Sequence, residues 1–216
     1  MKRQFIFVIF FVVAIVFKAN GQTGIFYSTD KDLSNSLINY IYQDKRNYIW
    51  IATEDGLNKF DGIKFTVYKN KPNDSTSLKN NYVRCLFEDS KNRFWVGCIN
   101  GLQQFDRKTN HFEEIKIFSS TDKRIYPHII SIIEANDGCI WISTSGEGIL
   151  KISEKNDKTF QTVTAINSKL PTPYLTFIFQ DSAEKFWIGT ANYGLYLYDA
   201  STGQMHAFNV RNRKIG

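Results

Sequence analysis

The chain has 216 residues, of which 43% are hydrophobic, 22% charged and 15% aromatic, the composition of an ordinary globular protein of one or two domains. Its formal net charge is +6, but Lys and Arg are spread along the chain with Asp and Glu between them. This pattern indicates a solvated surface of mixed charge, and it excludes the dense basic patch of a nucleic-acid-binding protein.

The first 21 residues are typical of a secretory signal peptide. A basic pair, Lys2 and Arg3, precedes an apolar run of 13 residues, and small residues at 19–21 precede Gln22. The alternative is a membrane anchor, but crossing a bilayer takes about 20 apolar residues, and Lys18 ends the run earlier. We therefore expect export, with cleavage before Gln22 and a mature region of residues 22–216.

One five-residue unit recurs four times in the mature region. Its copies are Ile49-Trp50-Ile51-Ala52-Thr53, Phe94-Trp95-Val96-Gly97-Cys98, Ile140-Trp141-Ile142-Ser143-Thr144 and Phe186-Trp187-Ile188-Gly189-Thr190. The tryptophans lie 45, 46 and 46 residues apart and are the four Trp of the chain. A fixed period of roughly 40–50 residues built on one apolar unit indicates a propeller or a solenoid.

A predicted strand and a turn precede each Trp unit. The first strands are expected at 38–43, 83–88, 129–134 and 175–180. The turns begin at Asp44, Asp89 and Asp181, whereas the third copy has Ala135 at this place, followed by Asn-Asp-Gly. Because short Asp and Asn side chains bond to nearby backbone amides, we interpret the acids as turn formers and not as catalytic residues.

Each Trp unit reads as a strand with apolar residues on both faces, which is typical of burial on both sides. The residue two after each Trp is small (Ala52, Gly97, Ser143 or Gly189), which lets a neighbouring sheet approach closely. A third and a fourth strand complete each unit. Four short antiparallel strands per unit predict an all-β propeller of about four blades. Unit length and strand content exclude leucine-rich, ankyrin and helical repeats.

The three cysteines predict no disulfide. The turn before the Trp strand is expected to be a three-residue loop with a bulge, so Asp89 pairs with Arg93 and Cys85 faces Gly97 instead of Cys98. A one-residue offset puts the side chains of Cys85 and Cys98 on opposite faces, so we expect free, half-buried thiols. No Cys or His spacing resembles a metal site, and we expect neither a metal nor a cofactor.

The four units resemble the two-component regulator propeller repeat. The first copy shows the pattern as Gln43-Asp44, then Ile49-Trp50-Ile51-Ala52-Thr53-Glu54-Asp55-Gly56-Leu57, then Phe60-Asp61. The resemblance covers residues 25 to about 208. It implies the periplasmic sensor of a membrane-spanning histidine kinase, often a hybrid kinase that detects carbohydrates. Sensors of that family carry many more blades, a β-sandwich linker, a membrane helix and a kinase. We therefore expect an incomplete N-terminal part of a larger propeller, with a self-contained short propeller as the alternative.

The resemblance implies a two-component signal-transduction sensor that binds a small molecule, an oligosaccharide, and performs no chemistry. Contact with the membrane would be made only through a missing C-terminal part, and the full-length sensor could form a homodimer. Two other functions stay open. One is a propeller scaffold for protein–protein interaction, and the other is an exported propeller lyase or hydrolase, which would need an acid–base pair at the channel mouth.

The expected ligand site lies on the face made by two kinds of loop. Loops between consecutive blades carry Asn35, Asn80, Asn81, His128 and Tyr174. Loops between the second and third strands carry Glu54, Asp55, Asn100, Glu147, Asn192 and Tyr193. Amides and carboxylates can bond sugar hydroxyls, and aromatic rings can cover the apolar face of a sugar. The alternative is that Asn residues and prolines only shape these loops.

Overall fold

The computed structural model describes residues 27–28, 32–152, 159–162 and 164–208. The predicted signal peptide lies outside these residues and stays a prediction. Within the described ranges, no helix is both long and apolar enough to cross a membrane.

The described chain forms four β-sheet units, here called blades one to four. Blade one holds β1 (Ile38–Gln43), β2 (Ile49–Thr53), β3 (Gly56–Phe60) and β4 (Phe65–Tyr68). Blade two holds β5 (Val83–Glu88), β6 (Phe94–Cys98), β7 (Gly101–Asp106) and β8 (His111–Phe118). After β9 (Arg124–Ile125), blade three holds β10 (His128–Glu134), β11 (Ile140–Ser145), β12 (Ile149–Ile152) and β13 (Thr159–Thr162). After α1 (Thr164–Asn167), blade four holds β14 (Leu175–Gln180), β15 (Lys185–Thr190), β16 (Gly194–Asp199) and β17 (Gln204–Ala207).

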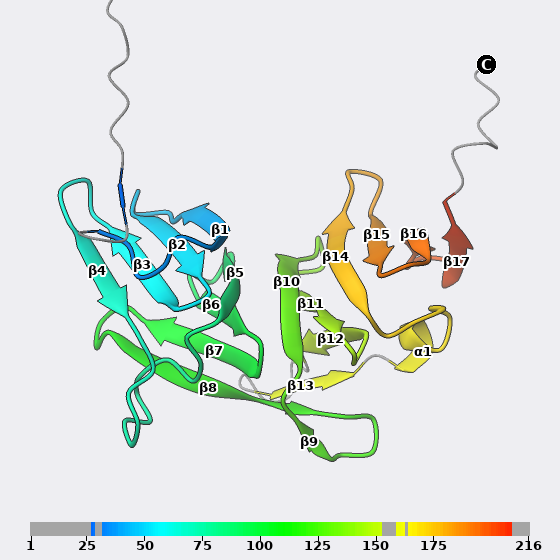
Figure 1. Ribbon diagram of the computed structural model, residues 1–216. Helices are drawn as coiled ribbons and strands as arrows, with labels where there is room; N and C mark the ends of the chain where they lie inside the picture. The colour runs from blue at the N-terminus through cyan, green and yellow to red at the C-terminus, as the bar shows by residue number, and fades with distance from the viewer. Residues whose placement is uncertain (1–26, 29–31, 153–158, 163, 209–216) are drawn as a thin grey trace, which may run out of the picture.

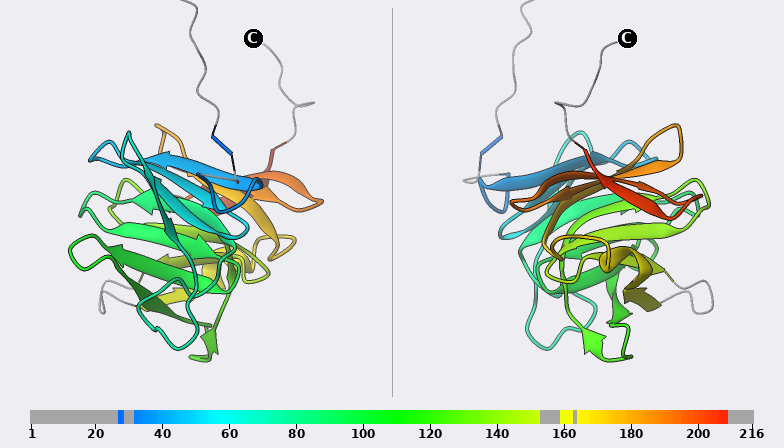
Figure 2. Two further views of the ribbon diagram at one scale, coloured as in Figure 1. Left: turned by 60° about the vertical axis from the view of Figure 1, so that its left-hand side comes forward. Right: turned by 90° about the vertical axis from the view of Figure 1, so that its right-hand side faces the viewer.

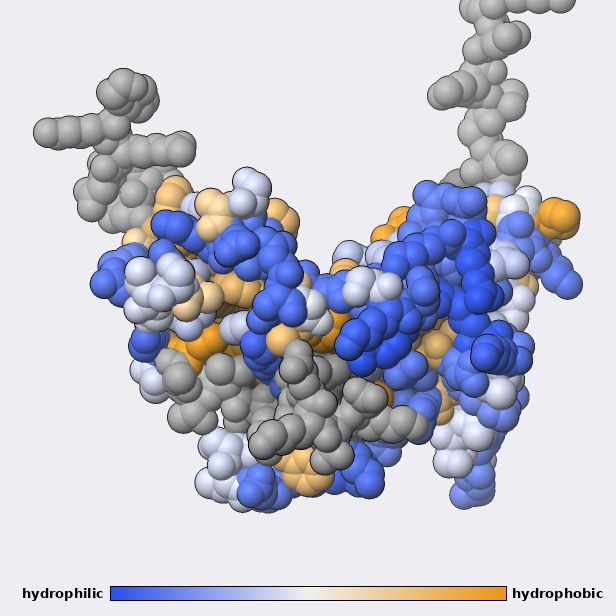
Figure 3. Space-filling view, turned by 180° about the vertical axis from the view of Figure 1, so that it is seen from behind, coloured by the Kyte–Doolittle hydropathy of each residue, from blue (hydrophilic) through white to orange (hydrophobic). Residues whose placement is uncertain are grey.

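The blades follow one another around an open arc (Figure 1) and pack face to face (Figure 2). Contacts between β1 and β5, β5 and β10, and β10 and β14 bring the first strands of successive blades side by side. The space-filling view shows a hollow between the arms formed by blade one and blade four (Figure 3). The all-β propeller fold predicted from the repeat is confirmed.

The outer strands of blades two and three depart from the expected antiparallel pattern. Within each blade neighbouring strands pair antiparallel, but β13 also pairs with β8 in parallel and joins the two blades into one sheet. The short β9 adds to β8 as well. Because both strands pair with Ile117 and Phe118, β13 and β9 lie along opposite edges of the end of β8 and satisfy backbone groups that it would otherwise leave free. Neither β9 nor α1 was expected from the sequence.

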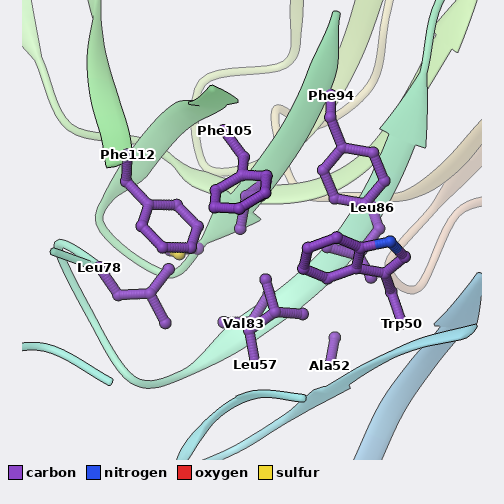
Figure 4. Packing of buried hydrophobic residues seen from close by; sticks show 11 residues of the cluster. Trp50, Ala52, Leu57, Leu78, Val83, Leu86, Phe94, Phe105 and Phe112 are labelled. Atoms are coloured by element: carbon purple, nitrogen blue, oxygen red, sulfur yellow. The ribbon is translucent and has the colours of Figure 1, made fainter. Parts of the chain in front are cut away.

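The apolar core lies between the blades. Trp50 and Leu57 of blade one pack with Leu86, Phe94 and Phe112 of blade two in one buried cluster (Figure 4). The ring centroids of Trp50 and Phe94 are 4.7 Å apart. Two further clusters join blade two to blade three and blade three to blade four. The first three Trp strands therefore serve the junction with the next blade, as their apolar faces indicated.

The turn before each Trp strand has the predicted bulge geometry. Asn47, Asn92, Gly138 and Glu184 all have positive φ, between 61° and 76°. Cys85 pairs with Gly97, and a Cβ at Gly97 would lie 2.6 Å from both Cys85 Sγ and Ile129 Cγ2 of the next blade. The expected close approach of neighbouring sheets is therefore present, and it requires glycine at this point.

None of the three cysteines forms a disulfide, as predicted, but their side chains are buried instead of half-buried. Cys85 lies in the cluster between blades two and three, and Cys98 lies in the cluster between blades one and two. Burial raises the pKa of the Cys98 thiol to about 12 and also raises the pKa of Cys85. The sequence placed these residues on a blade face, and the neighbouring blade then covers them.

Every first strand contains a β-bulge that the sequence did not reveal. The register shifts between the first and third residues of each first strand in blades one, two and four, and between the second and fourth residues of β10. The extra residues are Asn39, Arg84, Ile130 and Thr176. Bulges bend a strand and turn a side chain toward a new direction, and they are frequent beside binding sites.

Candidate functional site

Interblade loops and inner loops meet on one face, here called the loop face. Asn81, in the loop before blade two, donates from Nδ2 to Asp55 Oδ1 in the inner loop of blade one, at 2.9 Å. Its backbone carbonyl accepts from Gly56 N at 2.8 Å. The loop before blade four does the same for blade three, because Pro173 O accepts from Gly146 N and Gly148 N at 3.1 and 3.0 Å. Loops predicted to form one surface are therefore in direct contact.

Three of the predicted asparagines shape the loops through their own side chains. Asn35 Oδ1 accepts from Leu37 N at 2.7 Å, and Asn80 Oδ1 accepts from Tyr82 N at 2.8 Å. Asn81 Oδ1 accepts from Asn70 N at 2.6 Å. The bonds of Asn35 and Asn80 join residues two apart and are the local bonds by which Asn stabilises a turn. The bond of Asn81 joins residues 11 apart and ties the interblade loop to the end of blade one.

Asp55 is held in the inner loop of blade one by two neighbours. Besides Asn81, it accepts from Lys69 Nζ at 2.6 Å in a half-exposed ion pair. The Lys69 hydrogen bond holds the pKa of Asp55 below its usual value. The carboxylate is therefore ionised and fixed in place at neutral pH.

The remaining loop residues differ in exposure. Tyr174 and Tyr193 are 55% and 59% exposed, so their rings are open to solvent. Glu147 and Asn192 are also exposed, and Glu54 is partly buried. Open aromatic rings beside carboxylates and amides give this face the chemical mixture that sugars bind.

Two predicted residues belong to a half-buried polar cluster, here called the Arg84–His128 cluster, of Tyr82, Arg84, Asn100 and His128. The Tyr82 and His128 rings lie 6.4 Å apart, and Ile99 N, next to Asn100, donates to Tyr82 O at 3.3 Å. Arg84 Nε, Asn100 Oδ1 and His128 Nε2 are buried atoms without a hydrogen-bond partner. Buried polar atoms are almost always paired in folded proteins, so each of these three atoms is a position that a ligand or water can satisfy.

Electrostatics favour a neutral imidazole in this cluster. Burial, and then the positive charge of Arg84, hold the pKa of His128 below its usual value. At neutral pH the ring therefore has one N–H donor and one nitrogen acceptor. The cluster can donate from Arg84 and accept at Asn100, which suits a ligand that carries several hydroxyl groups.

Sequence reasoning missed Arg84, the bulged residue of β5. Its Nη1 donates to Asn39 Oδ1, from the bulge of β1, at 3.4 Å, and Asn39 Nδ2 donates to Val83 O at 2.8 Å. The bulge turns Arg84 toward the first strand of blade one. One signal was available: Arg84 is a charged residue inside the otherwise apolar run Val83-Arg84-Cys85-Leu86.

The described residues contain no group of three or more His, Cys, Asp or Glu placed to hold a metal ion. The Arg84–His128 cluster has an imidazole but no carboxylate among its members.

The repeats match the family model "Two component regulator propeller" at residues 32–55, 77–100 and 124–146. Each matched segment runs from an interblade loop or connection through a first strand, its turn and the following Trp strand. Three of the four repeats of this chain thus belong to the two-component regulator propeller family. The unit around Trp187 lies outside the matched segments, but it has the same four-stranded arrangement.

A curated protein is similar to this chain over most of the chain's length. Histidine kinase P4 of Formosa agariphila is 37% identical over 248 aligned positions, which cover 90% of this chain and 18% of that protein. This chain therefore spans about a fifth of the length of the curated relative that it matches.

Solved structures show the same fold. The extracellular domain of BT3049, described as a hybrid two-component system of B. thetaiotaomicron, superposes with a TM-score of 0.74 at 21% identity. That match covers 86% of this chain and 26% of the other. Virginiamycin B lyase from Staphylococcus aureus superposes with a TM-score of 0.56 at 17% identity, over 84% of this chain and 59% of the lyase. The fold alone is thus shared by sensor domains and an enzyme.

Proposed function

We propose that this chain is the N-terminal part of the exported, periplasmic sensor domain of a two-component signal-transduction protein, and that it binds an oligosaccharide on the loop face without performing chemistry. The regulator propeller repeats and the similarity to a histidine kinase support a sensor. The basic start and short apolar run of residues 1–21 support export.

The Arg84–His128 cluster is the observation that carries the ligand proposal. Its three unpartnered polar atoms belong to Asn100, in the inner loop of blade two, and to Arg84 and His128, at the starts of the first strands that follow interblade loops. Hydroxyl groups can both accept from Arg84 Nε and donate to Asn100 Oδ1, so a ligand rich in hydroxyl groups suits both atoms. The open rings of Tyr174 and Tyr193 extend this polar surface with apolar area, which favours several linked sugars over a single one.

Signalling would follow from unequal affinity for two arrangements of the full protein. A ligand shifts an equilibrium only as far as it binds one state more tightly than the other. The loop face joins successive blades through contacts such as Asn81 with Asp55, so a ligand held there would favour one spacing of the blades. The transducing domains would lie in the rest of the protein.

The test is oligosaccharide binding by the full-length sensor, measured by calorimetry across a panel of oligosaccharides. Arg84→Met keeps an unbranched side chain out to the ε position and removes the donors, and Asn81→Ala with Tyr174→Ala removes loop-face contacts. We expect each to weaken binding by tenfold or more, since buried hydrogen bonds to charged groups contribute about 1.5–3 kcal/mol. Lys91→Ala, in the opposite turn, is the matched control. Unchanged affinity in the first two variants, with loss in the control, would show that the other face binds.

A further inference from the structure

A network of charged side chains fills the junction between blades one and two, at the end where the turns join first and second strands. Asp44 Oδ2 accepts from Trp50 Nε1 at 2.9 Å. Arg107, which enters from blade two, lies 3.5 Å from Asp44 Oδ2 and 3.0 Å from Glu88 Oε2. Its guanidinium also covers the Phe94 ring at 4.9 Å. Side chains therefore occupy the space beside the indole nitrogen.

At the junction between blades three and four the equivalent positions have lost this network. Alignment of the repeats on Trp50 and Trp141 puts Ala135 at the place of Asp44. Alignment on Trp95 and Trp187, with the one additional residue of blade four, puts Ala200 at the place of Arg107. Gln180 likewise replaces Glu88. Both members of the ion pair are thus alanine at the same junction.

The loss leaves a buried donor without a partner. Trp141 is 5% exposed, and its Nε1 has no hydrogen-bond partner. The backbone of the turn is unchanged, because Ala135 N donates to Cys139 O at 2.9 Å as Asp44 N donates to Tyr48 O at 3.0 Å. By this equivalence the indole N–H points toward the Cβ of Ala135, where a carboxylate lies in the other blades.

A pocket of about 640 Å³ opens at this place, and Ala135, Trp141 and Ala200 all line it. It lies between blades three and four, whose strands are seen in Figure 1. The groove at the junction of blades one and two, of about 870 Å³, is lined by Arg107 and Glu88 but not by Asp44 or Trp50. The pocket between blades three and four therefore reaches its tryptophan, whereas the groove between blades one and two does not. The reason is that Ala135 and Ala200 are short, whereas Asp44 and Arg107 fill the equivalent space.

The lining indicates what kind of molecule would fit. The rings of Trp141 and Phe186 lie 4.5 Å apart and give the pocket an aromatic wall. Lys151 pairs with Asp137 at 3.2 Å, and Lys185 lies 3.7 Å from Asp199. Glu184 also lines the pocket, so three carboxylates stand against the two ammonium groups of Lys151 and Lys185. This excess of negative charge disfavours an anion, while the carboxylates can accept hydrogen bonds from hydroxyl groups.

We propose that this pocket is a second binding site, for a small uncharged ring that carries hydroxyl groups. One ligand oxygen accepts the hydrogen bond of Trp141 Nε1, the apolar face of the ring covers the aromatic wall, and other hydroxyls bond the rim carboxylates. The site lies at the turns between first and second strands, so it does not depend on the proposed ligand site on the loop face.

The test uses the full-length sensor, or the whole 216-residue chain if it is stable, and the side-chain N–H signals of tryptophan in nuclear magnetic resonance. Trp141→Phe assigns the Trp141 signal. Glucose and myo-inositol serve as uncharged probes, and glucuronate serves as the charged counterpart of glucose. We expect the uncharged probes to shift the Trp141 signal in a saturable way, and glucuronate to bind at least tenfold more weakly.

Ala135→Asp places a carboxylate against the indole and should abolish the saturable shift. Ala207→Asp is the matched control, because it adds the same charge to an exposed position of blade four outside the pocket, and it should bind as the parent does. The proposal is overturned if neither uncharged probe shifts the Trp141 signal, if Ala135→Asp binds like the parent, or if glucuronate binds more tightly than glucose. None of these outcomes depends on oligosaccharide binding at the loop face.

Discussion

Asp44 and Trp50 are joined by a buried hydrogen bond from Trp50 Nε1 to Asp44 Oδ2, 2.9 Å long. The other oxygen of Asp44 accepts from Arg46 N at 2.9 Å and Tyr48 N at 3.0 Å. One carboxylate thus fixes the turn and orients the tryptophan of the strand that follows it. The same bond recurs from Trp95 to Asp89, at 3.0 Å, and from Trp187 to Asp181, at 2.7 Å.

Asp44→Ala should destabilise the fold by about 1–3 kcal/mol, because it leaves the buried Trp50 Nε1 and two turn amides without their acceptor. The free energy of unfolding from urea denaturation measures the effect. Asp106→Ala is the control, since Asp106 is exposed and accepts hydrogen bonds from Lys108 N and Thr109 Oγ1 of its own turn. An equal loss of stability in both variants would mean that the bond to the indole contributes nothing.

Ala135→Asp should stabilise the protein by about 1 kcal/mol, the usual contribution of one new hydrogen bond. Trp141 Nε1 has no partner, and the turn backbone already has the geometry found at Asp44. A higher thermal midpoint is the expected result. A lower midpoint would show that the carboxylate cannot reach the indole, or that Asp137 repels it.

Trp95→Ala should cost roughly 3–5 kcal/mol, as truncation of a large buried aromatic does. Trp95 is 0% exposed and packs in the cluster between blades two and three. Trp187→Ala offers a matched comparison within the same motif. Trp187 is only partly buried, so its truncation should cost less. Denaturation midpoints for the pair measure the difference, and equal costs would contradict burial as the cause.

Acid should destabilise the protein through His128. Burial and Arg84 lower the pKa of His128 in the folded state, so the unfolded chain, with a pKa of about 6.5, takes up the proton first. Stability is therefore highest above about pH 6.5 and falls as the pH drops from there to the lowered pKa of the folded state. His128→Gln should flatten this part of the curve of unfolding free energy against pH.

The exposed His206 provides the control for this titration, because it lies on the outer strand β17. His206→Gln should leave the slope between pH 6.5 and lower values unchanged. If His128→Gln keeps the slope of the parent, the imidazole is not desolvated in solution and the Arg84–His128 cluster is open to water.

Features set within one repeat could be predicted from the sequence because they depend on neighbouring residues. The period of the Trp unit predicted the blades, and Asn or Gly three residues before Trp predicted the bulged turn that pairs Cys85 with Gly97. The loop-face residues were likewise predicted from their positions in the loops of each repeat. Their contact is confirmed at Asn81 and Asp55, while their role in ligand binding stays a prediction.

Contacts between repeats were decided by the tertiary structure, because they depend on how blades pack and on residues far apart in the chain. Arg107 and Asp44 are 63 residues apart in the chain, and no local sequence pattern predicts that they form an ion pair. The bulge that turns Arg84 toward Asn39, and the parallel pairing of β13 with β8, are also set by the neighbouring strand and not by the residues before or after. The sequence by itself determined the blade and its turns. Only packing of the blades decided which polar groups meet a partner and which, like Trp141 Nε1, are left beside a pocket.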